Sequence, residues 1–390
     1  ISFELIPFSS IIKYGESNDQ LIYSNTGTFL SYENDYCKTN STRSVHSVSF
    51  DILPNQLIYY KVSSNDGVTW SDIYQTIGIN REYPQSLALW GDMGINCELS
   101  SVSQIASDLN NNYHSYAIHF GDTAYNMHDE CGKVGDDFLN AAMVYSTSSP
   151  IVYTNGNHES GPYKRYHEYI YRLADGQNDL AEASGSNNNR YFLWSVGPIT
   201  FFTIDPDAWI YPPVYDLAKP QYEWLDSALA KVNRTETPWL IGTVHRAMYC
   251  TKTYDRECNG EALTLRYGFR KEQYGLESLF QKYGVDIYFS GHTHHYERTW
   301  PVRDGAATQY DYINPKATVH IQSGIAGVDG YDSFDAPQQS WEAFRDLTFS
   351  PSYSRLVIYN DTHATVQQLF SNNGSVLDEF TIIQNFHGEF

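Results

Sequence analysis

Six short apolar runs in the middle of the chain each end in a glycine or in a polar residue capable of chemistry. The runs are SLALW (86–90), SYAIHF (115–120), PIVYTN (150–155), ITFFTI (199–204), PWLIGTV (238–244) and VDIYFS (285–290). Between them, apolar residues recur at helical spacing over residues 98–112, 136–147, 220–232 and 272–283. Strands that alternate with helices in this way predict βαβ units and a largely parallel sheet. Ligands bind at the carboxyl ends of such strands.

The two ends of the chain show strand patterns without helical spacing. Near the N-terminus, LIYYKV (57–62) and TWSDIYQTI (69–77) flank the turn NDG (65–67), which predicts a β-hairpin. After about residue 318 the strands TVHIQSG, RLVIYN, ATVQQLF and LDEFTII follow. We therefore predict a small antiparallel β-sandwich over residues 1–85 and an α/β catalytic domain over residues 86–390.

Net charge restricts the kind of partner. The chain has 390 residues, with 25 basic and 46 acidic side chains, which gives a formal net charge of −21. We therefore expect neither nucleic acid nor an anionic membrane surface as a partner. No run approaches the roughly 18 apolar residues of a membrane span. An anionic substrate would need a local cationic centre, and a bound metal can supply one.

Several features favour an exported protein. The chain starts at Ile1 and not at Met, so we expect that a signal peptide was removed. Four sequons place candidate N-glycosylation sites at Asn40, Asn233, Asn360 and Asn373. Together they predict a secreted or a lysosomal or endosomal glycoprotein.

The five cysteines are an odd number, so one remains unpaired in the chain if the others form disulfides. We predict a disulfide between Cys250 and Cys258, because the loop between them is long enough to close. Cys97 and Cys131 each follow a strand that ends in an aspartate, and they are the second candidate pair. Cys37 would then be left over. The alternative is that all five are free thiols.

Oxygen and imidazole donors gather where the predicted parallel strands end. They are Asp92, Asp122, Asn157, His245, His292 and His294. Each such residue alone is weak evidence, because turns after strands often carry polar side chains. Their joint occurrence at one edge of a sheet suits a pair of first-row metals better than calcium or a structural zinc. Two adjacent metals are common machinery for the hydrolysis of phosphoesters.

The order GD…GD…GNHE…H…GHxH over roughly residues 86–300 resembles that of calcineurin-like metallophosphoesterases. Most of that superfamily opens with Asp-x-His, whereas this chain reads Asp92-Met93-Gly94 and so lacks that histidine. Tyr125, in GDTAY, is placed to replace it. With GDMG, GNHE, VH and GHTH, the pattern is similar to the long, two-domain purple acid phosphatases. The resemblance implies a four-layer sandwich of mixed sheets flanked by helices, preceded by a fibronectin III-like domain.

The same resemblance implies a ligand set for two metals. The first metal would take Asp92, Asp122, Tyr125 and His294. The second would take Asp122, Asn157, His245 and His292, with Asp122 as the bridge. A phenol has a pKa of about 10, so a strong Lewis acid is needed to hold Tyr125 ionised in acid. This division of ligands suits Fe³⁺ as the first metal and divalent iron, zinc or manganese as the second.

His158, in GNHE, is expected to contact the phosphate or the leaving group, with Asn157 also in the substrate site. The alternative for His158 is a helix-start residue bonded to backbone. We expect a supporting role for His295 and for the following YER (296–298). The loop at residues 246–266 contains no histidine, unlike the plant enzymes, and looks more like the animal long-form branch. His158 is therefore the first candidate for the catalytic acid.

We therefore predict an acid phosphatase that hydrolyses small phosphate monoesters with a metal-activated hydroxide and releases inorganic phosphate. A homodimer is left open. One alternative is a phosphodiesterase or nucleotide hydrolase that uses the same metal site. Another is a degenerate domain that binds metal without turnover. The sequence does not specify the natural substrate.

Overall fold

The computed structural model describes most of the chain. The described residues are 9–33, 42–95, 100–111, 114–160, 172–173, 175–211, 216–252, 256–269, 273–328 and 336–390. No helix in these ranges is long and apolar enough to cross a membrane.

The N-terminal region forms one antiparallel sheet in the order β3-β2-β1-β4-β5. Its strands are β1 (Ser10–Gly15), β2 (Tyr23–Glu33), β3 (Thr42–Ser47), β4 (Leu57–Ser63) and β5 (Tyr74–Ile77). The predicted hairpin is confirmed, because β4 pairs antiparallel with β5. The first half of β2 pairs with β1 and its second half with β3. The region is rich in strands as expected, whereas its packing as a fibronectin III-like sandwich stays a prediction.

The second sheet has the order β10-β8-β6-β22-β23-β24. Its strands are β6 (Gln85–Trp90), β8 (Tyr116–Phe120), β10 (Ile151–Thr154), β22 (Ser352–Asn360), β23 (His363–Phe370) and β24 (Val376–Ile383). The first three in sequence pair parallel, and the C-terminal three pair antiparallel. Helices α1 (Ser100–Asn110) and α2 (Asp129–Ser146) pack against this sheet around the buried Trp90 and Tyr145.

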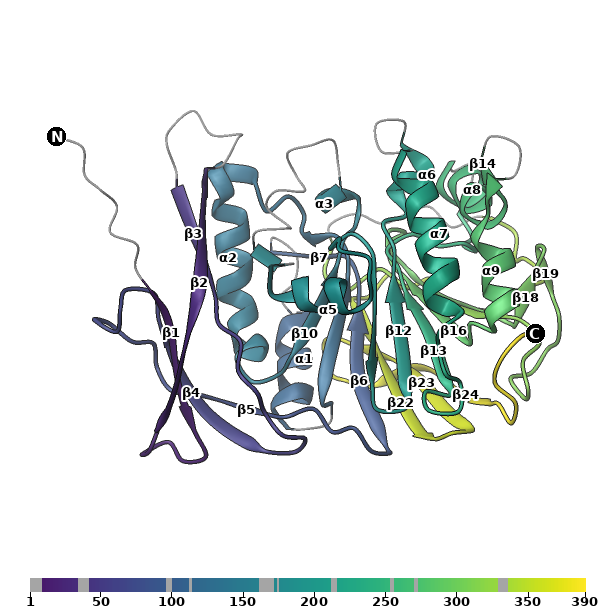
Figure 1. Cartoon of the computed structure of the whole chain (residues 1–390). Helices are drawn as coiled ribbons and strands as arrows, with labels where there is room; N and C mark the ends of the chain where they lie inside the picture. Colours follow the sequence, from purple (N-terminus) through teal and green to yellow (C-terminus); the bar gives the residue numbers. More distant parts are fainter. Residues whose placement is uncertain are drawn as a thin grey trace.

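The third sheet has the order β11-β12-β13-β16-β20-β17-β21. Its strands are β11 (Phe192–Val196), β12 (Ile199–Thr203), β13 (Trp239–Thr243), β16 (Ile287–Ser290), β17 (Tyr296–Thr299), β20 (Val319–Ser323) and β21 (Glu342–Arg345). Strands β12, β13, β16 and β20 are parallel, as the βαβ pattern predicts. Helices α7 (Ala218–Leu229) and α9 (Leu276–Tyr283) share a core with this sheet and lie on the side of the molecule away from α2 (Figure 1).

Successive side chains of a strand point to opposite faces of its sheet, and this alternation builds the layers. Leu87 and Leu89 of β6 point into a core shared with Phe201 and Ile241 of the third sheet. The residues between them on β6 face α1 and α2 instead. Each fully buried side chain of this size contributes roughly 1.5–3 kcal/mol. The result is the predicted four layers of two mixed sheets between helices. The C-terminal strands make the second sheet less parallel than the central pattern suggested.

The remaining elements are short and connect the layers. They are β7 (Met93–Gly94), β9 (Thr123–Ala124), α3 (Asn157–Ser160), η2 (Asp175–Gln177), α5 (Asn178–Ala183), α6 (Asp207–Ile210), η4 (Glu257–Glu261), α8 (Ala262–Tyr267), β14 (Gly268–Phe269), β15 (Gln273–Tyr274), β18 (Val302–Arg303) and β19 (Ala306–Ala307). Helix α2 begins seven residues before its predicted start, at Asp129 instead of residue 136. Its first turn contains three residues with positive φ, from Glu130 to Gly132, which helical periodicity does not reveal.

The N-terminal sheet contacts the end of α2 and the residues after it. The Tyr60 hydroxyl donates to the Thr147 carbonyl at 2.7 Å, and Thr76 Oγ1 donates to the Ser148 carbonyl at 2.9 Å. Arg43 Nη2 lies 2.8 Å from Asp136 Oδ2 in α2. The sheet therefore packs on the side of the α/β region, away from the strand ends that carry the candidate chemistry (Figure 1).

Candidate metal centre

The predicted donors follow strands of two facing sheets. Asp92, Asp122 and Asn157 follow β6, β8 and β10 of the second sheet. His245 follows β13 of the third sheet, and the segment with His292 and His294 follows β16. The structure brings these donors and Tyr125 together in two connected clusters.

Turns with left-handed backbone, and glycines packed against the carboxylates, bring these donors close together. Asp92, Asp122 and His292 have φ of 61°, 52° and 74°, in the left-handed region that non-glycine residues rarely adopt. Such strain concentrates at functional sites. A Cβ at Gly156 would lie 2.3 Å from Asp122 Oδ1, and one at Gly291 would lie 2.2 Å from Asp92 Oδ2. Both positions therefore need glycine for the carboxylates to sit where they do.

The first cluster contains Asp92, Tyr125 and His294. The Tyr125 hydroxyl donates to Asp92 Oδ1 at 3.0 Å and lies 2.9 Å from His294 Nε2. His294 Nε2 lies 3.6 Å from Asp92 Oδ1. One carboxylate, one phenol and one imidazole thus point their polar atoms at one small region. The Tyr125 hydroxyl therefore bonds side chains of this cluster.

The second cluster contains Asp122, Asn157, His245 and His292. His245 Nδ1 lies 3.1 Å from the Phe120 carbonyl, which can only accept, so Nδ1 carries the proton. In the neutral ring Nε2 is then an acceptor, yet it faces Asn157 Oδ1 at 2.9 Å and Asp122 Oδ2 at 3.3 Å. Ligand atoms of Asp122, His245 and His292 all lie within 4.8 Å of one another. Several lone pairs converging on one space require a second proton on His245 or a metal ion.

The two clusters are joined through Asp92, because the His292 backbone N–H donates to Asp92 Oδ2 at 2.8 Å. Asp122 lies close to the same junction and is almost fully buried. The structure therefore assembles all seven predicted ligand residues. Asp205, another aspartate at a strand end, does not join them; it pairs with Arg190 instead.

Burial dominates the electrostatics of the site. Burial and the nearby carboxylate of Asp92 raise the pKa of Tyr125 well above its usual value. Burial and the Arg246 guanidinium lower the pKa of His292 to about 4. Burial also favours a higher pKa for Asp122, but the adjacent His245 outweighs it and holds this pKa below its usual range. A bound cation favours the phenolate and the neutral imidazoles, so it would supply the charge that this arrangement lacks.

His158 lies at the open side of the second cluster. Its backbone N–H donates to Asp122 Oδ1 at 3.0 Å, and its Nε2 lies 3.8 Å from Asp122 Oδ2. Its Nδ1 lies 2.9 Å from Asn126 Oδ1, and its ring meets the Tyr125 ring edge-on at 4.7 Å between centroids. The side chain keeps 26% of its surface exposed, so it can reach a ligand that enters the site.

Sequence reasoning did not assign a role to Glu159, which supports the turns. This buried carboxylate accepts backbone N–H bonds from Asp122 at 2.8 Å, Thr123 at 2.8 Å and Gly156 at 2.7 Å. It therefore ties the turn after β8 to the turn after β10. In the sequence, the only indication of this role is the position of Glu159 next to His158 in GNHE.

Arg246 and Glu257 were also missed. Arg246 Nη1 lies 2.7 Å from His292 Nε2, and Glu257 Oε1 lies 3.3 Å from the same nitrogen. Arg246 is buried, with its Nε donating to Asp207 at 2.7 Å and its Nη1 to Glu261. Charged residues in an irregular loop follow no periodic pattern, so the sequence does not predict such contacts.

The predicted supporting residues form a separate buried network. His295 Nε2 lies 2.8 Å from Glu297 Oε2, and the same carboxylate accepts the Thr251 N–H at 2.8 Å. Arg298 donates from Nε to Asp378 Oδ2 at 2.7 Å. This network fastens the segment after His245 to β17.

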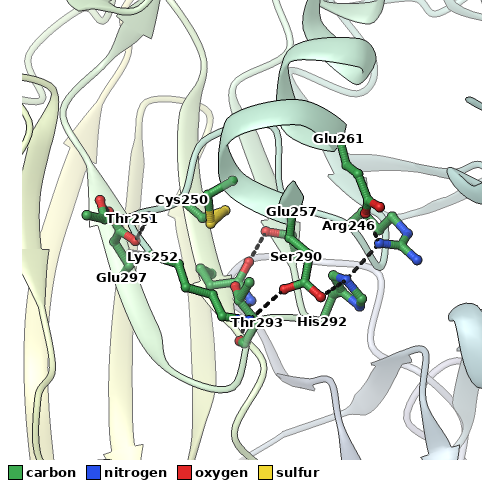
Figure 2. Close-up of a disulfide and its surroundings, with 12 residues drawn as sticks. Arg246, Cys250, Thr251, Lys252, Glu257, Glu261, Ser290, His292, Thr293 and Glu297 are labelled. Carbon is green, nitrogen blue, oxygen red and sulfur yellow. Dashed lines mark hydrogen bonds and ion pairs between the residues drawn. A yellow bond between two sulfur atoms is a disulfide. The ribbon is translucent and has the colours of Figure 1, made fainter. Parts of the chain in front are cut away.

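The predicted disulfide between Cys250 and Cys258 is present beside this network (Figure 2). Cys131 is also disulfide-bonded. Its predicted partner Cys97 lies outside the described residues, as do Cys37 and the sequon residue Asn40.

Comparisons with known proteins identify the family of this chain. A family model described as Calcineurin-like phosphoesterase matches residues 86–296, and one described as Iron/zinc purple acid phosphatase-like protein C matches residues 317–379. The chain is 30% identical over 398 residues to Acid phosphatase type 7 of Danio rerio, covering 97% of this chain and 86% of that protein. It is 28% identical over 354 residues to Acid phosphatase type 7 of Homo sapiens, covering 88% of this chain and 78% of that protein.

Among solved structures, the purple acid phosphatase PPD1 from yellow lupin (Lupinus luteus) seeds is similar, with a TM-score of 0.74 and 20% identity. The alignment covers 98% of this chain and 71% of that one. At this identity the likeness shows the fold alone.

Proposed function

This chain belongs to the purple acid phosphatases of the calcineurin-like phosphoesterase family, and on that premise we propose that it hydrolyses phosphate monoesters at the two clusters that are joined through Asp92. The observation that carries the proposal is the convergence of acceptors at His245. Its Nε2 lies 2.9 Å from Asn157 Oδ1 and 3.3 Å from Asp122 Oδ2, and its Nδ1 is already engaged by the Phe120 carbonyl. A divalent cation satisfies such a set while His245 stays neutral, whereas without a cation the set needs a second proton on His245.

The donor types fit one ferric and one divalent ion. We assign Fe³⁺ to Asp92, Tyr125 and His294 together with Asp122, because carboxylates and a phenolate favour a hard, highly charged ion. We assign the divalent ion, zinc, iron or manganese, to Asn157, His245 and His292 together with Asp122. The matched family description names iron and zinc. When bound, the pair supplies Lewis acidity that activates water and neutralises phosphate charge.

The residues of the chain itself orient and protonate the substrate. In its doubly protonated form, His158 donates from Nδ1 to Asn126 Oδ1 and carries a second proton on Nε2, which faces Asp122 and the open side of the site. We propose that His158 binds the phosphate and gives a proton to the departing ester oxygen, with Asn157 beside it. Because the chain carries a net charge of −21, this local cationic site is what attracts an anionic substrate.

The remaining proposals extend this picture. A fibronectin III-like domain over residues 1–85 would precede a catalytic domain over residues 86–390. Asn233, Asn360 and Asn373 are exposed and available for glycosylation, which fits a secreted or lysosomal or endosomal enzyme. A homodimer is compatible with this picture, and we expect no nucleic-acid partner.

Metal analysis with a phosphatase assay tests the function. We expect close to two metals per chain and hydrolysis of aryl phosphates in acid, with phosphodiesters and nucleotides cleaved more slowly. Faster cleavage of a phosphodiester would favour the phosphodiesterase alternative. Two bound metals without turnover of any phosphate ester would favour a degenerate metal-binding protein.

A further inference from the structure

The segment after His245 is closed by the disulfide between Cys250 and Cys258, whose Cα atoms lie 5.2 Å apart. On one side, Thr251 is anchored to Glu297 through its backbone N–H and its hydroxyl. On the other side, Cys258 follows Glu257 in η4. Figure 2 shows Glu257 between this disulfide and His292. The disulfide therefore fastens the backbone beside Glu257 to an anchored segment.

The Glu257 carboxylate reaches from this loop to His292. Its Oε1 lies 3.3 Å from His292 Nε2, and its Oε2 accepts from Lys252 Nζ at 2.9 Å. The glutamate side chain is 29% exposed and the lysine side chain 14%. The two carboxylate oxygens are thus divided between an imidazole and an ammonium group.

Arg246 competes for the same imidazole nitrogen. Its Nη1 lies 2.7 Å from His292 Nε2, and a guanidinium can only donate. Asp207 and Glu261 hold this guanidinium in place. His292 Nε2 therefore faces a fixed donor on one side and a carboxylate acceptor on the other.

A neutral imidazole can satisfy only one of these neighbours. If Nε2 accepts from Arg246, the ring proton lies on Nδ1 and no lone pair there is free for a metal. If Nε2 carries the proton and donates it to Glu257, the Nδ1 lone pair is free. Because Arg246 and Glu257 occupy the Nε2 side of the ring, Nδ1 is the nitrogen left for coordination.

The geometry points to Glu257 as the positioning residue of His292: it accepts the Nε2–H bond and so selects the tautomer that binds the divalent metal, against the effect of Arg246. This role rests on the proposed function, because it concerns one ligand of the second metal. A carboxylate that accepts from a metal-bound histidine typically changes metal affinity by about 10–100-fold.

Two variants of similar size separate the hydrogen bond from packing. Glu257→Gln keeps an oxygen acceptor on the loop, whereas Glu257→Met removes it. Protein loaded with iron is titrated with Zn²⁺, and zinc occupancy is measured by metal analysis alongside the visible absorption of the iron. We expect zinc to bind Glu257→Met about 10–100-fold more weakly. Glu257→Gln should stay within a few-fold of wild type, and the iron content of both should not change.

Glu277→Gln is the matched control, because Glu277 is a buried carboxylate nearby that bonds Tyr249 and not the metal site. It should leave zinc affinity unchanged. Wild-type zinc affinity in Glu257→Met, an equal loss in both Glu257 variants, or loss of iron together with zinc would overturn the positioning role. A wild-type protein that binds neither metal would overturn the proposed function instead.

Discussion

His158 Nδ1 lies 2.9 Å from Asn126 Oδ1, so the amide oxygen accepts the Nδ1–H and leaves Nε2 as the nitrogen that can pass on a second proton. Nε2 faces Asp122 and the open side of the site. Asn126 directly follows Tyr125, so the segment that supplies the phenol also orients the candidate acid.

The first prediction follows from this contact. His158→Ala should slow alkyl phosphates, which have poor leaving groups, by about 10²–10⁴-fold and activated aryl phosphates much less. Asn126→Leu removes the acceptor at similar size and should show the same substrate selectivity with a smaller loss. Steady-state kinetics with both substrates check this. If Asn126→Leu still lowers the rate when added to His158→Ala, then Asn126 does not act through His158.

Asp122→Asn tests the shared ligand. Asp122 contacts both His158 and His245, so removal of its charge should abolish binding of both metals and activity together. Asp108→Asn is the control, since Asp108 is equally a buried aspartate but bonds Tyr353 and Arg355 away from the site. That control should lose stability and keep its metals. Retention of two metals by Asp122→Asn at a near-normal rate would refute the bridging role.

A redox prediction follows from the position of Glu257. Reduction of the disulfide between Cys250 and Cys258 frees the loop beside Glu257, so zinc affinity should fall while the iron absorption stays. The Cys250→Ala, Cys258→Ala double variant should bind zinc as weakly as the reduced protein and should not respond to reductant. Unchanged zinc affinity after complete reduction, verified by mass spectrometry, would show that the loop holds its place without the disulfide.

Stability in acid should depend on buried histidines. Burial, with a contribution from Arg266, lowers the pKa of His320 to about 3, and its ring packs against Tyr249 and Tyr288. Because the folded pKa lies below the unfolded value of about 6.5, the unfolded state takes up the proton first. The contribution of His320 to folding stability is therefore full above pH 6.5 and falls as the pH drops toward 3, with a loss of about 3 kcal/mol at pH 4.5.

His320→Phe removes this proton uptake and keeps an aromatic ring in the same packing. The difference between the melting temperatures at pH 7 and pH 4.5 should therefore be smaller in the variant than in wild type. Thermal unfolding followed by circular dichroism at both pH values gives this difference. An identical difference in both proteins would assign the loss of stability in acid to other groups.

Particular residues show which parts of the fold and of the site can be predicted from the sequence. The strands that end at Asp92 and Asp122 were predictable, because buried parallel strands are continuous apolar runs and turns follow them directly. Strand β12 is likewise followed by an aspartate, Asp205, but this residue pairs with Arg190, so a strand end alone does not identify a ligand. Arg246 and Glu257 meet His292 only through an irregular loop closed by a disulfide. Such contacts depend on tertiary packing, which neither periodicity nor a short motif encodes.

The most direct test of the central claim is the visible absorption spectrum of iron-loaded protein, recorded for wild type and for Tyr125→Phe. A phenolate bound to Fe³⁺ has electrons close in energy to empty iron orbitals, so light can move charge from ligand to metal. Wild type should therefore be coloured, and the colour should survive reductants that convert only the second metal to the divalent state. Tyr125→Phe keeps the ring and removes the donor oxygen, so it should be colourless, bind iron more weakly and be reduced more easily. A wild type with full iron and no visible band, or a Tyr125→Phe protein with an unchanged spectrum, would contradict the account.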